Sequence, residues 1–240
     1  MQGSVNSKMT QTANERQSRL SVCIPTQNCA NKLIQAIESV APVADEIVIV
    51  DGGSSDNTRE VSCSFERVRY FSHPWPDNYA KQFNYTMDQA AGDWILILGS
   101  DEAIGVNMRR KIRKLIQSRR HDCYIFPTYW VIQREPLCYV NSTKLYPDYH
   151  QRLFRNQARF RYVETRRAHM RFADGIQGAG KKIKDTHIFH FDFVYNDRQA
   201  RERKAGNRTA LAPETERINR THYLFEDYPH SIRKCREKLW

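Results

Sequence analysis

The sequence has 240 residues, of which 40% are hydrophobic and 27% are charged. It can bury the core of one large domain or two small ones, which excludes disordered and fibrous classes for most of the chain. Lysine and arginine number 38 against 27 aspartate and glutamate residues, a formal net charge of +11. This charge favours a polyanionic partner, and nucleic acid, an anionic membrane surface and a phosphorylated glycan all fit it.

Residues 1–18 are polar and lack the apolar stretch of a secretory signal. We therefore interpret them as a disordered tail and expect the protein to stay in the cytoplasm. The longest apolar runs, such as 47–50 and 94–98, have the length of strands and are far shorter than the ~20 residues that span a bilayer. We expect no transmembrane segment, so contact with the inner face of a membrane would be peripheral.

The first part of the chain alternates between strand and helix patterns. Residues 20–25 form a short apolar run, and apolar side chains recur at helical spacing over 31–40. Residues 46–50 form a second, β-branched run that ends at a polar stretch, 51–56. A strand, helix, strand unit of this kind builds a parallel sheet.

The same alternation continues with a strand at 67–71, a helix at 78–90 and a buried strand at 93–98. Ligands of open α/β sheets bind beyond the carboxyl ends of the strands. We therefore expect three polar loops to meet at one edge of the sheet and form a site: 25–28, 51–56 and 99–102.

The second half is less regular and favours antiparallel strands. We expect a basic amphipathic helix at 107–117, and the segment 173–185, with three glycines and little apolar content, is typical of a mobile loop over a site. Strands are predicted at 123–132, 151–154, 159–163 and 188–194, and polar helical segments at 196–211 and 213–239.

Four blocks of the sequence resemble family 2 glycosyltransferases, most closely the lipopolysaccharide-core β-glucosyltransferase branch. They are IPTQN at 24–28, EIVIVDGGSSDNT at 46–58, KQFNYTMDQAAGDWILILGSDE at 81–102 and YPDYHQRLFRN at 146–156. The resemblance implies the GT-A fold, an α/β fold with a mixed, mainly parallel central sheet flanked by helices, here with a C-terminal helical extension. It implies one domain at 19–195, with a nucleotide-binding half (19–104) and an acceptor-side half (105–195), followed by a C-terminal helical segment at 196–240.

A nucleotide-sugar donor needs contacts to its base and ribose, and Asp51, at the end of a strand, can accept hydrogen bonds from a uracil ring. The resemblance assigns this role to the matching aspartate of the family. Alternatively, Asp51 only caps a helix that begins near Asp56. The further donor-binding candidates are Pro25, Thr26, Asn28, Gly53, Lys81, Asn84 and Ser100.

A diphosphate leaving group carries charge that a divalent cation, Mn²⁺ or Mg²⁺, usually neutralises. The family's Asp-x-Asp motif is replaced here by Gly-Ser-Asp at 99–101, so Asp101 is the expected metal ligand while the first carboxylate is missing. Glu102 either compensates for the missing carboxylate or has a structural role in the first turn of a helix. His190 occupies the family's late histidine position and either completes the metal site or is a core histidine, and strand alternation directs His187 to the opposite face.

Inverting transfer is a single displacement at the anomeric carbon, and one carboxylate must accept the proton of the acceptor hydroxyl. Glu164 is the preferred base because it follows Tyr162 and Val163, where relatives carry a His-Glu pair. Asp148 is the alternative base, or it orders Arg152 through a salt bridge.

Together, the resemblance and the charge predict an inverting, metal-dependent glycosyltransferase with a donor that is UDP-linked. Its acceptor is expected to be an anionic glycan or glycolipid of the lipopolysaccharide type, reached at a peripheral membrane surface. One alternative is a transferase that modifies a hydroxylated base of nucleic acid. Another is a degenerate module that binds a nucleotide or polyanion without catalysis, which the missing acidic side chain at Gly99 would explain.

Overall fold

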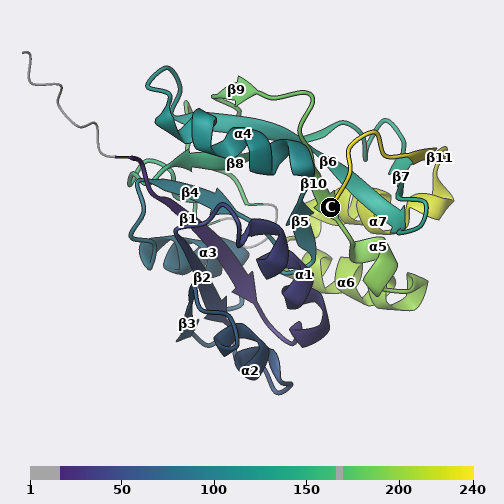
Figure 1. Ribbon diagram of the computed structural model, residues 1–240. Coiled ribbons are helices and arrows are strands. Elements are labelled where there is room, and N and C mark those ends of the chain that lie inside the picture. Colours follow the sequence, from purple (N-terminus) through teal and green to yellow (C-terminus); the bar gives the residue numbers. More distant parts are fainter. Residues whose placement is uncertain (1–16, 166–169) are drawn as a thin grey trace, which may run out of the picture.

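The computed structural model describes residues 17–165 and 170–240, so the predicted tail at 1–18 lies, except for its last two residues, outside the described residues. Strands and helices alternate through the first half, and the strands join in one twisted sheet (Figure 1). The strands are β1 (Leu20–Thr26), β2 (Glu46–Asp51), β3 (Val68–Ser72), β4 (Trp94–Ile97), β5 (Glu102–Ile104), β6 (Cys123–Gln133), β7 (Cys138–Asn141), β8 (Asp148–Arg155), β9 (Lys181–Lys182), β10 (Ile188–His190) and β11 (Ser231–Lys234). The helices are α1 (Ala30–Val40), α2 (Thr58–Cys63), α3 (Tyr79–Asp88), α4 (Val106–Gln117), α5 (Asp192–Tyr195), α6 (Arg198–Leu211) and α7 (Glu216–Tyr223), with 3-10 turns η1 (Pro213–Thr215) and η2 (Phe225–Asp227).

The sheet has the strand order β11-β7-β6-β8-β4-β1-β2-β3. β4, β1, β2 and β3 are parallel to their neighbours in this group, whereas β8, β6, β7 and β11 continue the sheet in antiparallel fashion. β10 lies between β5 and β6, antiparallel to the first and parallel to the second. The predicted mixed sheet, parallel at its start and antiparallel in its second half, is confirmed.

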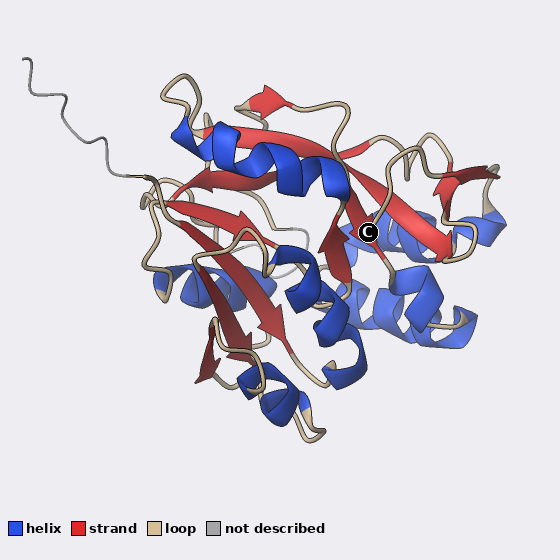
Figure 2. Cartoon of the chain, in the orientation of Figure 1, coloured by secondary structure: helices blue, strands red, loops and turns tan. Residues whose placement is uncertain are grey.

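Helices cover both faces of the parallel strands (Figure 2). On one face, Val22 of β1 packs in a cluster with Ile37 of α1 and Ile112 of α4. On the other face, Cys23 packs in a cluster with Met87 of α3. Every residue of β2 is buried, as expected for a strand with helices on both sides, and this explains its continuous apolar sequence.

The predicted strand at 159–163 is wrong. Within the described residues, this segment makes an isolated bridge between Tyr162 and Phe172. The backbone N–H and C=O of Tyr162 are instead taken by the side chain of Asn84, at 2.8 and 2.9 Å, so they are not available to a neighbouring strand. The side-chain amide of Asn84, on α3, thus takes the place of a neighbouring strand.

The predicted strand at 188–194 ends early, at His190. The backbone N–H of Phe191 donates to the carbonyl of Asp101 at 2.9 Å, and the chain then turns into α5. The predicted helical segment at 213–239 is confirmed for α7 but wrong for its end, where Ser231–Lys234 forms β11 and pairs with β7. Strand pairing between distant segments overrides the local pattern at this position.

The segment 173–185, predicted as a mobile loop, contains β9, which pairs with β6. The side-chain amide of Gln151 holds the turn before β9: it accepts from the N–H of Gly178 at 2.8 Å and donates to the carbonyls of Ile176 and Ala179 at 2.8 and 2.9 Å. Among the helices of the described residues, none has the length and apolar character needed to cross a bilayer.

Candidate active site

The structure brings Asp101 and His190, the two metal ligands predicted from the sequence, into contact. Asp101 follows β4 at the carboxyl edge of the sheet, and His190 ends β10. His190 Nε2 lies 3.3 Å from Asp101 Oδ1, and both side chains are largely buried. His187, in contrast, points away from Asp101 and binds Glu237, as strand alternation predicts.

A third residue of the cluster, Asp192, was missed in the sequence analysis. One ligand atom from each of Asp101, His190 and Asp192 lies within 4.8 Å of the other two. Asp192 is fully buried, and its Oδ1 accepts from Lys204 and, at 2.8 Å, from Asn196 Nδ2. Its Oδ2 has no hydrogen-bond partner among the described residues, although a buried carboxylate oxygen normally has one.

Opposite charges hold Asp101 in its ionised form. Burial by itself would raise the pKa of Asp101, but the charges of His190 and Lys204 outweigh burial and hold that pKa well below its usual value. Burial would lower the pKa of His190 and of Lys204, and Asp101 raises both. Lys204 Nζ lies 3.6 Å from Asp101 Oδ2. Asp101 thus lies between two cationic partners, His190 and Lys204. A cation bound here would take the place of the His190 proton, because only the neutral imidazole ligates a metal.

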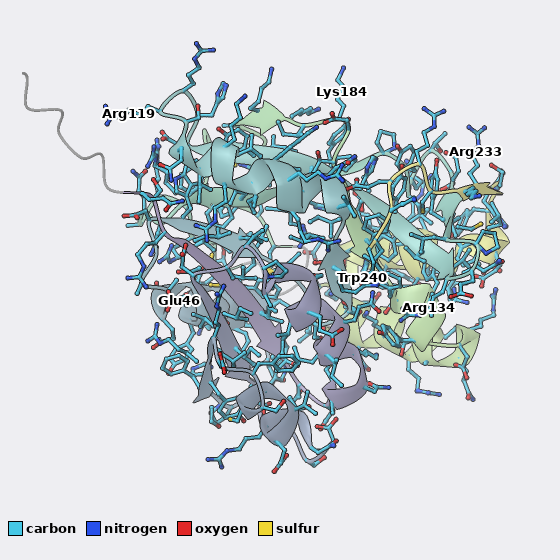
Figure 3. All side chains as sticks on the ribbon, in the orientation of Figure 1. Glu46, Arg119, Arg134, Lys184, Arg233 and Trp240 are labelled. Carbon is cyan, nitrogen blue, oxygen red and sulfur yellow. The ribbon has the colours of Figure 1, made fainter. Side chains whose placement is uncertain are left out.

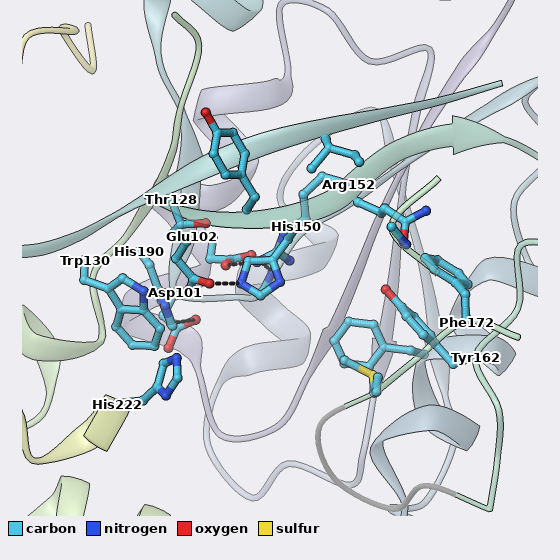
Figure 4. Close-up of a pocket in the computed structure, with 18 of the residues that line it drawn as sticks. Asp101, Glu102, Thr128, Trp130, His150, Arg152, Tyr162, Phe172, His190 and His222 are labelled. Atoms are coloured by element: carbon cyan, nitrogen blue, oxygen red, sulfur yellow. Dashed lines mark hydrogen bonds and ion pairs between the residues drawn. The ribbon is translucent and has the colours of Figure 1, made fainter. Parts of the chain in front are cut away.

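Asp101 and His190 lie on the wall of a cavity of about 470 Å³, and the fully buried Asp192 adjoins them. Figure 4 shows two ends to this cavity: Asp101, His190, Trp130 and His222 gather at one, and Arg152, Tyr162 and Phe172 at the other. The cavity wall also carries several cationic side chains: Arg152, Lys182, Lys204 and Arg208. A cavity with a carboxylate cluster at one end and cationic side chains around it suits a cation together with an anionic ligand.

Asp148 lies on the same wall and has two hydrogen-bond partners. Its Oδ2 accepts from Trp130 Nε1 at 3.0 Å, and its Oδ1 lies 2.9 Å from His150 Nε2. Burial would raise the pKa of Asp148, but the charge and hydrogen bond of His150, together with the Trp130 hydrogen bond, lower it far below its usual value. Asp148 is therefore a carboxylate at neutral pH.

The predicted salt bridge from Asp148 to Arg152 is wrong. Arg152 Nη2 binds Glu102 Oε1 at 2.6 Å, and Glu102 Oε2 accepts from the N–H of Gly99 at 2.7 Å. Glu102 lies on β5 and not in a helix first turn, and it is held by these two partners. A Cβ atom at Gly99 would lie 2.9 Å from Asp101 Oδ1, so the glycine leaves room for the Asp101 carboxylate.

The structure does not bring Glu164, the base preferred from the sequence, to the cavity. Its side chain is exposed, and Oε1 accepts from Asn84 Nδ2 at 3.1 Å, while its carbonyl accepts from Asn78 at 2.7 Å. Asn84, a predicted donor contact, thus ties the 162–164 segment to α3. Lys81 is exposed in the first turn of the same helix, where its N–H is capped by Asn78.

The remaining predicted donor contacts gather at the carboxyl ends of β1 and β2, as expected. Thr26 pairs in register with Asp51, and Pro25 with Val50. Thr26 is buried, and its hydroxyl has no hydrogen-bond partner among the described residues. Asn28 Oδ1 accepts from the N–H of Ser55 at 2.8 Å, which joins the two loops, and Gly53 has a φ of +95° that favours glycine.

Asp51 shapes its own loop. Its Oδ1 accepts from the N–H groups of Gly53 and Ser54 at 3.1 and 2.9 Å, and its Oδ2 accepts from the hydroxyl of Tyr70 at 2.7 Å. The alternative that Asp51 caps the next helix is wrong, because the N–H of Thr58 at the start of α2 binds Asp56 at 3.0 Å. Ser100 is half-buried in the turn next to Asp101.

Comparison with known proteins agrees with this architecture. A family described as Glycosyl transferase family 2 matches residues 21–178. Uncharacterized glycosyltransferases of Mycoplasma pneumoniae and Mycoplasma genitalium are 30% and 32% identical over 120 and 124 residues, which is 45% and 46% of this chain and 40% and 41% of those proteins. The chain thus aligns with about two fifths of the length of these relatives.

A crystal structure of Staphylococcus aureus TarS, residues 1–349 in complex with UDP, resembles the chain in fold. The TM-score is 0.50 at 15% sequence identity, and the alignment covers 79% of this chain and 65% of that one. The fold is GT-A, as the sequence predicts.

Proposed function

The chain belongs to glycosyl transferase family 2, and we propose that it transfers a sugar, with inversion, from a UDP-linked donor to a hydroxyl group of an anionic glycan. One observation carries this proposal: Asp101 and His190 lie on the wall of a cavity with several cationic side chains, and they form a cluster with the buried Asp192, whose Oδ2 has no hydrogen-bond partner in the described part of the chain. This arrangement combines a place for a cation with a place for a diphosphate.

The metal site consists, in this proposal, of Asp101, His190 and Asp192. Two carboxylates and an imidazole suit Mn²⁺ or Mg²⁺, and Oδ2 of Asp192, for which the described residues supply no hydrogen-bond partner, is available as a ligand. When bound, the cation would neutralise the charge that develops on the diphosphate leaving group. Lys204 lies close to both Asp101 and Asp192 and balances part of the carboxylate charge.

The diphosphate is held by the cationic side chains of α6. Lys204 and Arg208 both line the cavity. The guanidinium of Arg208 lies 4.5 Å from the ring centre of Tyr79 and 5.6 Å from that of Tyr223, and its Nε has no hydrogen-bond partner among the described residues. A guanidinium that is oriented by two rings and retains a free donor suits phosphate recognition.

The nucleoside binds at the carboxyl ends of β1 and β2. Asp51 Oδ2 has a second lone pair beside the one that accepts from Tyr70, and the Thr26 hydroxyl binds none of the residues that the structure describes. Asn28 joins the two loops that carry these groups. The remaining proposed contacts come from the same edge and from α3: Pro25, Gly53, Lys81 and Ser100. Asn84 is not among them, because its buried side-chain amide is bound to Tyr162 and Glu164.

We assign the general base to Asp148 in preference to Glu164. Asp148 lines the cavity and is ionised, whereas Glu164 is exposed and bound to Asn84. The carboxylate of Asp148 accepts the proton of the acceptor hydroxyl as that oxygen attacks the anomeric carbon and the bond to the diphosphate breaks. His150, at 2.9 Å and half-exposed, offers this proton a route to solvent.

The acceptor occupies the other end of the cavity. Tyr162 and Phe172 stack at 4.4 Å and offer an apolar wall to a sugar ring, while Arg152 and Lys182 suit an anionic group. This favours a glycan of the lipopolysaccharide type, approached from the cytoplasmic side. Outside the cavity the positive charge is spread over several faces, with Arg119, Lys184 and Arg233 pointing outward in different directions (Figure 3).

The direct test is release of nucleoside diphosphate from UDP-, GDP- and dTDP-sugars with Mn²⁺, Mg²⁺ or EDTA. We expect slow hydrolysis of one UDP-sugar that requires metal and is lost in Asp101→Asn and Asp192→Asn. Glu202→Gln, which changes an exposed carboxylate on α6, is the matched control and should hydrolyse at the native rate. UDP binding without hydrolysis, when candidate acceptors are also supplied, would favour the degenerate binding module, and no nucleotide binding would refute the site.

A further inference from the structure

A buried chain of hydrogen bonds joins the C-terminal residues to β10. Glu237 is 6% exposed. Its Oε2 accepts from the backbone N–H and from Nδ1 of His187, at 2.9 and 3.0 Å, and its Oε1 accepts from the N–H of Asn107 at 2.9 Å. His187 immediately precedes β10, so Glu237 fixes the start of the strand that ends at His190.

The chain of hydrogen bonds continues to the segment that carries Asp148. Glu237 is an acceptor, so Nδ1 of His187 carries the proton and donates to it. Nε2 of the same imidazole then accepts from the hydroxyl of Tyr146 at 3.2 Å. The ring of Tyr129 stacks on both His187 and Tyr146, at 3.9 and 5.3 Å, and covers the contact. Tyr146 is separated from Asp148 by one residue.

We propose that Tyr146, His187 and Glu237, here called the brace, are positioning residues that set the distance between the general base and the metal site. This inference rests on the proposed function, because it takes Asp148 as the base and His190 as a metal ligand. His190 is the last residue of β10, which has only three residues, and Asp148 is the first residue of β8. Both functional groups therefore lie at the end of a strand. The brace joins these two stretches directly through side chains.

The surroundings of Glu237 keep the brace in one position. A Cβ atom at Gly105 would lie 2.5 Å from Glu237 Oε1, so only glycine leaves room for the carboxylate. The backbone N–H of Val106 donates to the carbonyl of Lys238 at 3.0 Å, and Leu239 packs in the same buried cluster as Phe189 of β10. The two residues that follow Glu237 are thus fastened, Lys238 through its backbone and Leu239 through its side chain.

Tyr146→Phe removes one hydroxyl from the brace and leaves the ring, and Glu237→Gln removes its charge at constant size. The matched control is Tyr139→Phe, since Tyr139 lies in the same aromatic cluster, 4.7 Å from Tyr146, but is not a member of the brace. The measurements are Mn²⁺ affinity by electron paramagnetic resonance, kcat for UDP-sugar hydrolysis and melting temperature, all on the full chain.

We expect Tyr146→Phe and Glu237→Gln to weaken Mn²⁺ binding about tenfold, as residues that orient metal ligands do, and to lower kcat, while Tyr139→Phe leaves both unchanged. A lower melting temperature with native Mn²⁺ affinity and native kcat would show that the brace is merely structural and would overturn the inference. If Glu237→Gln fails to fold, Tyr146→Phe decides the question. A native chain that binds no Mn²⁺ would refute the proposed metal site itself, a distinct result from loss of binding in the variants alone.

Discussion

The choice between Asp148 and Glu164 as base gives the sharpest mutational test. In Asp148→Asn, the amide oxygen can still accept from Trp130 Nε1, and the amide nitrogen can donate to Nε2 of a neutral His150, so the two hydrogen bonds of the site can re-form. The charge is lost, and with it about 1.5–3 kcal/mol of charge-assisted hydrogen bonding. We therefore expect a folded variant with a lower melting temperature.

The catalytic effect of Asp148→Asn should be much larger than its structural effect. A positioned general base contributes about 10²–10⁴-fold to a rate, which corresponds to roughly 3–5 kcal/mol of activation free energy. Glu164→Gln is the matched control, since its amide oxygen can still accept from Asn84 outside the cavity, and we expect kcat close to native.

The assay for both variants is metal-dependent hydrolysis of the donor that the native chain accepts, with water in place of the acceptor hydroxyl. UDP binding is measured alongside and should be native in both variants, because neither residue belongs to the metal cluster. A near-native rate in Asp148→Asn, or a hundredfold loss confined to Glu164→Gln, would refute the assignment of the base.

Two further predictions concern the carboxylates at the carboxyl and amino ends of the parallel strands. Gly99→Asp restores the family's first acidic position, yet it should weaken Mn²⁺ binding in a calorimetric titration, because its Cβ would lie 2.9 Å from Asp101 Oδ1; tighter binding would contradict this expectation. The side chain of Glu46 is 8% exposed and accepts from Ser21 and Arg69, and these hydrogen bonds outweigh burial and lower its pKa. A lowered pKa stabilises the fold above the unfolded-state pKa, and this stabilisation is lost as the pH falls through the folded-state pKa. Glu46→Gln should therefore reduce the free energy of unfolding in urea by about 2 kcal/mol at pH 7 and by much less near pH 3, whereas an equal loss at both pH values would contradict the role of the charge.

The parallel half of the fold could be predicted because its information is local. β1, α1 and β2 carry continuous or periodic apolar patterns, and the polar loops after β1, β2 and β4 follow from the strands that precede them. Asp101 and His190 were found through the family motif. β11 was missed because its pairing with β7 joins segments about ninety residues apart, and a short polar strand carries no periodic signal.

Asp192 could not be identified from strand periodicity, since the apolar run at 188–194 hides the turn after His190. That turn depends on the hydrogen bond from Phe191 to the carbonyl of Asp101, a contact between distant segments. The His-x-Asp spacing at 190–192 is a weak signal that two ligands share one side of the chain. Glu164 was preferred as base for its place in the sequence, but its side chain is exposed and bound to Asn84 and does not line the cavity, and this contact depends on the tertiary structure.

The central claim is that one cation and the diphosphate of the donor share the cluster of Asp101, His190 and Asp192. Calorimetric titration of UDP into the native chain, with Mn²⁺ or with EDTA, tests it most directly. We predict that Mn²⁺ tightens UDP binding at least about tenfold, within the usual range of coupling between two ligands, and that His190→Ala abolishes this effect. Equal UDP affinity with Mn²⁺ and with EDTA in the native chain would contradict the claim.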